Sequence, residues 1–187
     1  TESMQFPSSQ FSQVYEVNVS GGRSRMVTPM PMEAISISKD GKTWLYQDPE
    51  SLSVLLNKLA EASTSYLLGQ IAAGADCVMI FDTWGGIADT PRYLSHSLDP
   101  MVKIMSGIRS KHPNFPVILF TKQGSQWLSA MAKTGCTGLG LDWTIDIQQA
   151  RSLVGNKIAL QGNLDPMMLY ARPDVIEQET IRIIRQH

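Results

Sequence analysis

The stretch with the clearest potential for chemistry is a short apolar run that ends abruptly in polar residues. Cys77 to Phe81 reads CVMIF, and Asp82, Thr83, Trp84 and two glycines follow directly. A continuous apolar run of this length is typical of a buried parallel strand, and sites in α/β proteins lie beyond the carboxyl ends of such strands. The two glycines let the backbone turn tightly beside a ligand. We therefore expect a site at this point.

The four residues at the end of this run form the predicted substrate-binding set. The Thr83 hydroxyl is expected to hydrogen-bond a substrate, and a local bond to the backbone is its structural alternative. Phe81 and Trp84 are expected to form an apolar wall, a role that for Trp84 is balanced by simple packing. Asp82 is a candidate substrate contact or acid, but a carboxylate that accepts N–H groups of its own loop is the favoured interpretation. No catalytic residue is identified.

Polar residues follow three later apolar runs in the same way. They are Thr121-Lys122, Asp142-Trp143 and Gln161-Gly162-Asn163, whereas connectors at the opposite ends, such as Ala73-Gly74-Ala75, are plain. This asymmetry is the pattern of a (β/α) barrel, in which one rim carries function and the other stability. The sequence therefore predicts that these residues and Thr83 gather at a common mouth.

The charged residues at these ends have two possible roles each. Lys122 either attracts substrate carboxylates or extends its ammonium group along the surface. Asp142 is expected to hold loops together, and Asp165, which precedes a proline, to cap or fix a loop. These carboxylates are therefore interpreted as structural.

The sequence predicts no metal and no cofactor. His96, His112 and His187 have no metal-ligand neighbour at helical spacing. Cys77 and Cys136 lie in apolar, strand-like contexts and are expected to be buried free thiols inside strands. The glycines do not have the G-x-G-x-x-G spacing of a phosphate-binding loop.

Strands and helices are predicted to alternate through most of the chain. A first helix is expected from an N-cap at Asp48, through Pro49, to Gly74. A β-hairpin is predicted at 33–47 and a strand at Tyr15–Val19. The final helix is expected to bury Val175, Ile176, Ile181 and Ile184. The remaining strands are expected at 77–81, 117–120, 137–141 and 157–160, with helices at 97–111, 125–133, 146–153 and 174–185.

This order predicts an α/β fold of the (β/α)8 TIM-barrel type with about four βα units. A complete barrel takes about 250 residues, and this chain has 187, so we expect an incomplete barrel. Residues 1–187 are expected to form a single partial barrel domain, preceded by an irregular or β-hairpin segment, with the structure of residues 1–43 undetermined. Thr1 is not an initiator methionine, so we expect a chain that was processed, was cut or is incompletely represented.

The composition excludes several classes of partner. The net charge is −1 and hydrophobic residues make up 43%, so we expect a globular protein that binds neither nucleic acid nor membrane. The polar N-terminus has no features of a signal peptide, and the free thiols favour a cytoplasmic location.

Four stretches resemble the uroporphyrinogen decarboxylase family, and the combination of LDWT with QGNLDP at this spacing is highly specific. The likeness runs from about Trp44 to the C-terminus and leaves residues 1–43 outside. The stretches are Tyr66–Gly86 (YLLGQIAAGADCVMIFDTWGG), Phe120–Lys122 (FTK), Leu139–Thr144 (LGLDWT) and Leu160–Pro166 (LQGNLDP), with Trp44–Tyr46 and Leu169–Tyr170 also in agreement.

The resemblance implies a cytosolic (β/α)8 barrel, usually homodimeric, that needs no metal or organic cofactor. It implies removal of four acetate carboxyls from a tetrapyrrole, which converts uroporphyrinogen III to coproporphyrinogen III. Thr83 matches the substrate-contacting hydroxyl of the family's FD(S/T) strand. The family's arginine-bearing RQAGRY-type, aspartate-bearing FSDI-type and histidine-bearing NLGHG-type segments do not occur in this sequence, so the resemblance assigns no catalytic residue here.

Two alternatives remain open at this point. A methyltransferase of the same superfamily would use zinc held by His and Cys near strand ends, whereas Cys77 and Cys136 are expected inside strands. A catalytically incomplete barrel fragment would act only as a packing or binding module. Its unpaired strand edges would favour self-association unless residues 1–47 cover them.

Overall fold

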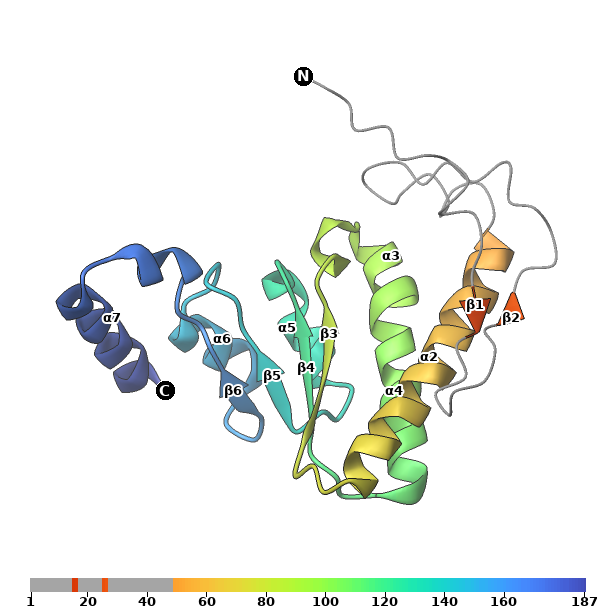
Figure 1. Cartoon of the computed structure of the whole chain (residues 1–187). Helices are drawn as coiled ribbons and strands as arrows, with labels where there is room; N and C mark the ends of the chain where they lie inside the picture. Colours follow the sequence, from red (N-terminus) through yellow and green to blue (C-terminus); the bar gives the residue numbers. More distant parts are fainter. Residues whose placement is uncertain (1–14, 17–24, 27–48) are drawn as a thin grey trace. The chain divides into compact units, whose positions relative to one another are not determined.

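The computed structural model describes residues 15–16, 25–26 and 49–187 (Figure 1). The chain divides into two units, Thr1–Leu52 and Ser53–His187. In the first unit, β1 (Tyr15–Glu16) pairs antiparallel with β2 (Arg25–Met26), so the strand predicted at Tyr15–Val19 begins where expected. The predicted hairpin at 33–47 and the predicted N-cap Asp48 lie outside the described residues. The single domain over 1–187 stays a prediction.

A parallel four-stranded sheet forms the centre of the second unit. The strands are β3 (Val78–Asp82), β4 (Val117–Thr121), β5 (Gly138–Gly140) and β6 (Ala159–Gln161), in the order β3-β4-β5-β6. The register pairs Asp82 with Thr121, and Gly140 with both Phe120 and Gln161. The carboxyl ends of all four strands therefore lie at the same end of the sheet. The prediction of four parallel strands joined through helices is confirmed, and sequential parallel order is what part of a (β/α)8 barrel shows.

Helices connect the strands as the apolar periodicity predicts. The long helix α2 begins at Pro49, a favoured first position, and chain reversal follows at Gly74, whose φ of 102° suits glycine. Asp146 caps α6 by accepting hydrogen bonds from the amides of Gln148 (2.8 Å) and Gln149 (3.3 Å). The principal helices are α2 (Pro49–Ala72), α4 (Asp99–Lys111), α5 (Leu128–Ala132), α6 (Ile147–Val154) and α7 (Pro173–Gln186).

The segment between β3 and α4 is more ordered than the predicted loop. Three short helical turns occupy it: η1 (Gly85–Ile87), α3 (Thr90–Tyr93) and the π-helical turn η2 (Leu94–Leu98). Asp89 caps α3 by accepting a hydrogen bond from the amide of Arg92 (3.1 Å). Two further 3₁₀ turns, η3 (Ser125–Trp127) and η4 (Pro166–Tyr170), follow β4 and β6.

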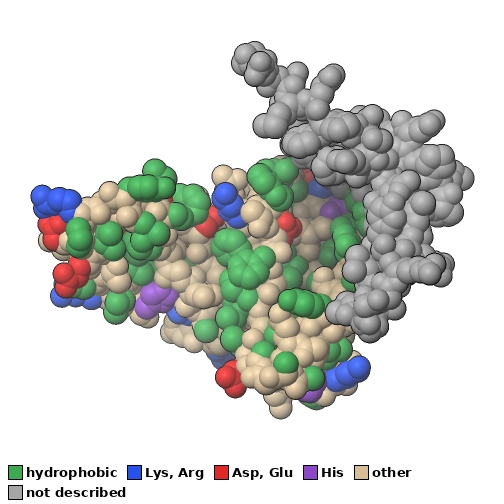
Figure 2. All heavy atoms as spheres, in the orientation of Figure 1, with side chains coloured by type: hydrophobic (Ala, Val, Ile, Leu, Met, Phe, Trp, Pro, Cys, Tyr) green, Lys and Arg blue, Asp and Glu red, His purple; other side chains and the backbone are tan. Residues whose placement is uncertain are grey.

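The two faces of the sheet differ in burial. Val117, Leu119 and Leu139 are fully buried and join one core cluster with residues of α4, α5 and α6, among them Ile108. Burial of each such side chain stabilises the fold by about 1.5–3 kcal/mol. The alternate residues of β3 and β4, among them Phe81 and Phe120, point to the opposite face of the sheet. On that face Phe81 is 64% exposed. Figure 2 shows hydrophobic side chains exposed over the strands on this face.

Two packing predictions are wrong. On α7 the least exposed positions are Ile176, Glu179, Ile183 and Gln186, which recur at helical spacing, and Ile183 is the buried residue. Three of the apolar residues predicted to be buried, Val175, Ile181 and Ile184, are exposed. Cys136 is buried as predicted and Cys77 is exposed; both are free thiols. Cys77 precedes β3 and Cys136 precedes β5, so neither thiol lies inside a strand.

Candidate functional site

The loops after the four strands are joined by hydrogen bonds at the carboxyl end of the sheet. The amide of Lys122 donates to the Asp82 carbonyl (3.1 Å), and the amide of Gln123 donates to a carboxylate oxygen of Asp142 (2.5 Å). The side-chain amide of Asn163 donates to the Asp142 carbonyl (2.8 Å). These contacts confirm that the polar residues after the strands gather at one end. We call the residues 82–98, 121–127, 141–146 and 161–172 the carboxyl-end rim.

Asp82 holds the first of these loops in shape. One carboxylate oxygen accepts hydrogen bonds from the amides of Trp84 (3.0 Å) and Gly85 (2.8 Å), and the other accepts one from the hydroxyl of Ser97. Such charge-assisted bonds are stronger than bonds between neutral groups. The contacts match the interpretation of Asp82 as a structural carboxylate. They fix the backbone on both sides of Thr83, which is exposed.

A buried aromatic pair connects the loop after β3 to the loop after β4. Tyr93 is fully buried, its ring stacks on that of Trp127 with centroids 3.8 Å apart, and its hydroxyl shares a hydrogen bond with that of Thr121 (3.0 Å). The indole nitrogen of Trp127 donates to the Thr90 hydroxyl (3.0 Å). Burial raises the pKa of Tyr93. The sequence placed Trp127 in the predicted helix at 125–133 but did not predict the pair, because no local pattern relates that segment to the turn that contains Tyr93.

The Tyr93 hydroxyl should contribute to stability below about pH 10. Tyr93→Phe removes the partner of the buried Thr121 hydroxyl, so we expect the free energy of unfolding to fall by about 1 kcal/mol. Because the pKa in the folded protein lies above the unfolded value of about 10, the advantage of the wild type is complete below that pH and declines as pH rises above it. Urea unfolding of both proteins at about pH 8 and about pH 11 measures this, with Tyr170→Phe, at an exposed tyrosine, as control. Equal stabilities of the two variants at the lower pH would contradict the expectation.

Asp142 is the central residue of the rim. It is only 6% exposed. One carboxylate oxygen accepts the Gln123 amide, and the other accepts both the amide (3.0 Å) and the hydroxyl (2.5 Å) of Thr144. A single carboxylate therefore ties the loop after β4 to the loop after β5. This confirms the prediction that Asp142 holds loops together.

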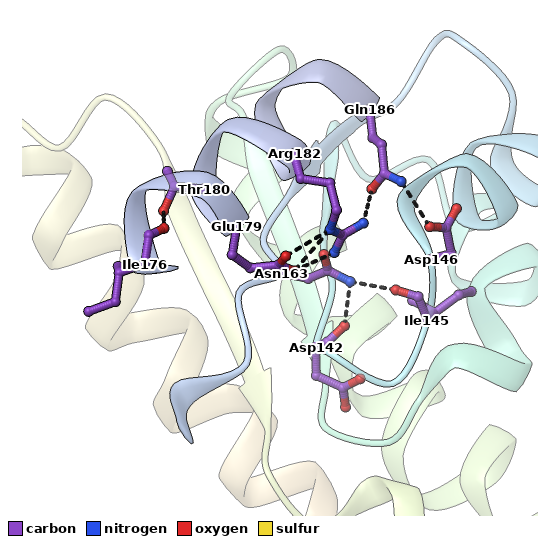
Figure 3. Close-up of polar contacts among 9 residues, drawn as sticks. All are labelled: Asp142, Ile145, Asp146, Asn163, Ile176, Glu179, Thr180, Arg182 and Gln186. Carbon is purple, nitrogen blue, oxygen red and sulfur yellow. Dashed lines mark hydrogen bonds and ion pairs between the residues drawn. The ribbon is translucent and has the colours of Figure 1, made fainter. Parts of the chain in front are cut away.

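Asn163 ties the loop after β6 to the same centre. Its side-chain amide donates to the carbonyls of Asp142 and Ile145 (2.8 and 2.5 Å), as Figure 3 shows. The side-chain amide of Gln186, on α7, donates to the capping residue Asp146 (3.2 Å), which connects the last helix to the start of α6 (Figure 3). Asp165 caps η4 by accepting the amide of Met167 (2.9 Å), as its position before a proline predicts.

The predicted wall residues are accessible at the carboxyl end of β3. Phe81 and Trp84 are 64% and 71% exposed. The Phe81 ring contacts that of Phe120 edge to face, with centroids 5.7 Å apart. Gly140 leaves room for this contact, because a Cβ atom there would lie 2.9 Å from the Phe120 ring. Phe81 and Phe120 thus present adjacent aromatic surface at the carboxyl ends of β3 and β4, and Thr83 follows Phe81 by two residues in the chain.

The residues that could bind a metal do not cluster in the described part of the chain. Within residues 49–187, no group of three or more His, Cys, Asp or Glu side chains is suitably placed for a metal ion. No helix there is long and apolar enough to cross a bilayer.

Comparison with known proteins agrees with this architecture. The family model described as uroporphyrinogen decarboxylase (URO-D) matches residues 35–187. A uroporphyrinogen decarboxylase of Vesicomyosocius okutanii subsp. Calyptogena okutanii (strain HA) is 45% identical over 170 residues, which are 91% of this chain and 49% of that protein. One of Escherichia coli O81 (strain ED1a) is 55% identical over 145 residues, 76% of this chain and 41% of that protein.

The match extends over most of this chain but over only part of each relative. The chain spans about half the length of the curated relatives it matches. The family model covers all four parallel strands and the whole carboxyl-end rim. The chain belongs to the uroporphyrinogen decarboxylase family.

Proposed function

We propose that this chain carries part of a uroporphyrinogen decarboxylase, a carboxy-lyase of porphyrin and heme biosynthesis. The reaction removes the acetate carboxyls of uroporphyrinogen III as CO₂, and a proton replaces each one, which gives coproporphyrinogen III. The observation that carries the proposal is the end of β3, where Thr83 is exposed and lies in the chain between the exposed aromatic residues Phe81 and Trp84. A flat, highly carboxylated macrocycle needs both apolar surface and fixed hydrogen-bond donors.

Each residue of the site has a defined role in this proposal. Thr83 donates its hydroxyl to a substrate carboxylate or accepts from a pyrrole N–H group. Phe81 and Trp84 pack against the macrocycle. Asp82 keeps the backbone of Thr83 and Trp84 in place through its bonds to the Trp84 and Gly85 amides. No residue of this chain is assigned as the proton donor, and no metal or cofactor is part of the proposal.

The same proposal extends to assembly and location. We propose a cytoplasmic homodimer, because the family resemblance implies both properties. β3 and β6 each have a strand neighbour on one side only within the described part of the chain, so both edges of the sheet offer hydrogen-bonding groups to further chain.

An activity assay separates this proposal from its main competitor, a barrel fragment that serves only for packing or binding. The purified chain is incubated anaerobically with uroporphyrinogen III, and the porphyrins are oxidised and separated by chromatography. Formation of heptacarboxylic to tetracarboxylic products supports the decarboxylase. Absence of any product, from a chain that is folded by circular dichroism, supports the competitor.

Thr83 provides the sharpest test of the site. We expect Thr83→Ala to lower kcat/KM by about tenfold, because it removes one hydrogen bond to a charged group, worth about 1.5 kcal/mol. Thr83→Ser keeps the hydroxyl and should retain most of the activity. Thr180→Ala is the control, since the Thr180 hydroxyl bonds only within α7, to the Ile176 carbonyl (2.7 Å; Figure 3). Unchanged activity of Thr83→Ala would remove Thr83 from the site.

A further inference from the structure

Lys122 and Trp143 form a pair on the carboxyl-end rim that the site described so far does not use. Lys122 directly follows β4, and Trp143 follows β5. The Lys122 ammonium lies over the indole of Trp143, with Nζ 5.9 Å from the ring centroid. This is the distance range of a cation–π interaction. The pair therefore joins one positive charge to one large flat apolar surface, of which 43% is exposed.

The buried Asp142 carboxylate fixes the backbone beside both members of the pair. Its oxygens accept the amides of Gln123, the residue after Lys122, and of Thr144, the residue after Trp143. The Asn163 side chain holds the carbonyl of Asp142 itself. Because three loops meet at this point, the pair is held in place before any ligand arrives, which lowers the cost of binding.

Lys122 differs from the other basic side chains of the rim in its lack of a carboxylate partner. Arg92 pairs with Asp89, and Arg172 pairs with Asp174 at 2.5 Å. Lys122 makes no ion pair with any side chain in the described ranges. Its charge is therefore available to an anion from solution.

The pair also lies next to the exposed aromatic surface of the sheet. Thr121 is buried, and Phe120 contacts Phe81 on the opposite face. Alternation along the strand places Lys122 on the face of Phe120. A ligand that packs against Phe81 and Phe120 would bring groups at its edge within reach of Lys122.

We propose that Lys122 and Trp143 form a carboxylate-binding subsite for the multiply carboxylated tetrapyrrole. The Lys122 ammonium binds a peripheral carboxylate by a charge-assisted hydrogen bond, and the Trp143 indole packs against the adjacent part of the macrocycle. The subsite rests on the proposed function for the identity of its ligand. It adds an anchoring cation to the hydroxyl and the aromatic wall.

Binding of uroporphyrin, the stable octacarboxylic porphyrin, tests the subsite without any need for turnover. Fluorescence titration of the full chain gives Kd at low and at high salt. We expect Lys122→Gln to raise Kd about fivefold at low salt and to reduce the salt dependence of binding, because one screened charge interaction is lost. Lys122→Arg should restore wild-type binding. Lys133→Gln, at an exposed lysine just after α5, makes the same charge change far from the rim and should leave Kd unchanged.

The outcomes separate the subsite from the activity. The subsite is supported if uroporphyrin binding becomes weaker and less salt-dependent in Lys122→Gln but not in Lys133→Gln. This holds even if the wild type forms no product in the activity assay. Equal Kd values for Lys122→Gln and Lys133→Gln overturn the subsite, even if the wild type is an active decarboxylase. Absence of uroporphyrin binding by the wild type also overturns it.

Discussion

Asp142→Ala should lower the free energy of unfolding by about 3 kcal/mol. The carboxylate is 6% exposed and accepts three hydrogen bonds, from the Gln123 amide, the Thr144 amide and the Thr144 hydroxyl. Its removal leaves the amides of Gln123 and Thr144 without their acceptor, whereas the Thr144 hydroxyl keeps its contact with the Ser125 hydroxyl (3.1 Å), and each unsatisfied buried donor costs about 1–3 kcal/mol. For the two amides the loss is about 2–6 kcal/mol, and because both bonds are only part-buried we expect a value in the lower half of that range, about 3 kcal/mol. Urea denaturation, followed by tryptophan fluorescence, measures the loss.

Asp165→Ala is the matched control for this prediction. Asp165 is also a rim carboxylate, but it accepts a single amide, that of Met167 (2.9 Å), at an exposed position. Loss of such a cap costs about 1 kcal/mol, so the two substitutions should differ by about 2 kcal/mol. Asp142→Ala should also weaken uroporphyrin binding, because the backbone beside Lys122 and Trp143 is released. Equal losses of stability at the two positions would show that Asp142 is no more than a local cap.

The sequence predicted the sheet and the structural carboxylates because both depend on local patterns. Each strand is a short apolar run in the sequence that is followed by polar residues, and such runs are easy to recognise. The four strands occur within one or two residues of their predicted bounds. Asp82 and Asp142 each precede a polar turn, where a carboxylate readily accepts the following amides, and each does so here. Local chemistry was sufficient in these places.

The predictions failed where packing between distant segments decides the outcome. On α7, the polar Glu179 and Gln186 share the inward stripe with Ile176 and Ile183, so the most apolar set of positions was not the buried one. Gln186 satisfies its amide on Asp146. The spacing of apolar residues along α7 does not predict a hydrogen bond between Gln186 and a residue of another helix. The stacked Tyr93–Trp127 pair likewise depends on two turns from different loops.

The Lys122–Trp143 pair shows a third case, in which the residues were visible but their relation was not. Both follow predicted strands, and the sequence left Lys122 equally suited to substrate binding and to a surface position. The structure adds the Asp142 carboxylate between the two loops and the contact of the ammonium with the indole. Parallel pairing of β4 with β5 brings the two positions together. The relation between Lys122 and Trp143 therefore depends on the order of the strands in the sheet.

Gly86→Ala should destabilise the protein by about 1–3 kcal/mol. The loops after β3 and β4 touch at this residue, where a Cβ atom would lie 2.2 Å from the Lys122 carbonyl oxygen and 2.6 Å from the Gln123 Cβ atom. A backbone oxygen cannot rotate away as a side chain can, so the loops must separate, at a cost typical of overpacking. Because the displaced residue is Lys122, uroporphyrin binding should weaken together with stability. Gly69→Ala is the control: Gly69 lies within α2, a Cβ atom there meets nothing within 4 Å, and alanine is the better helix former by about 1 kcal/mol. The same chemical change should thus lower stability at one glycine and raise it at the other, as thermal unfolding of the two variants can measure. A stable Gly86→Ala variant with wild-type porphyrin binding would mean that the two loops do not meet as described.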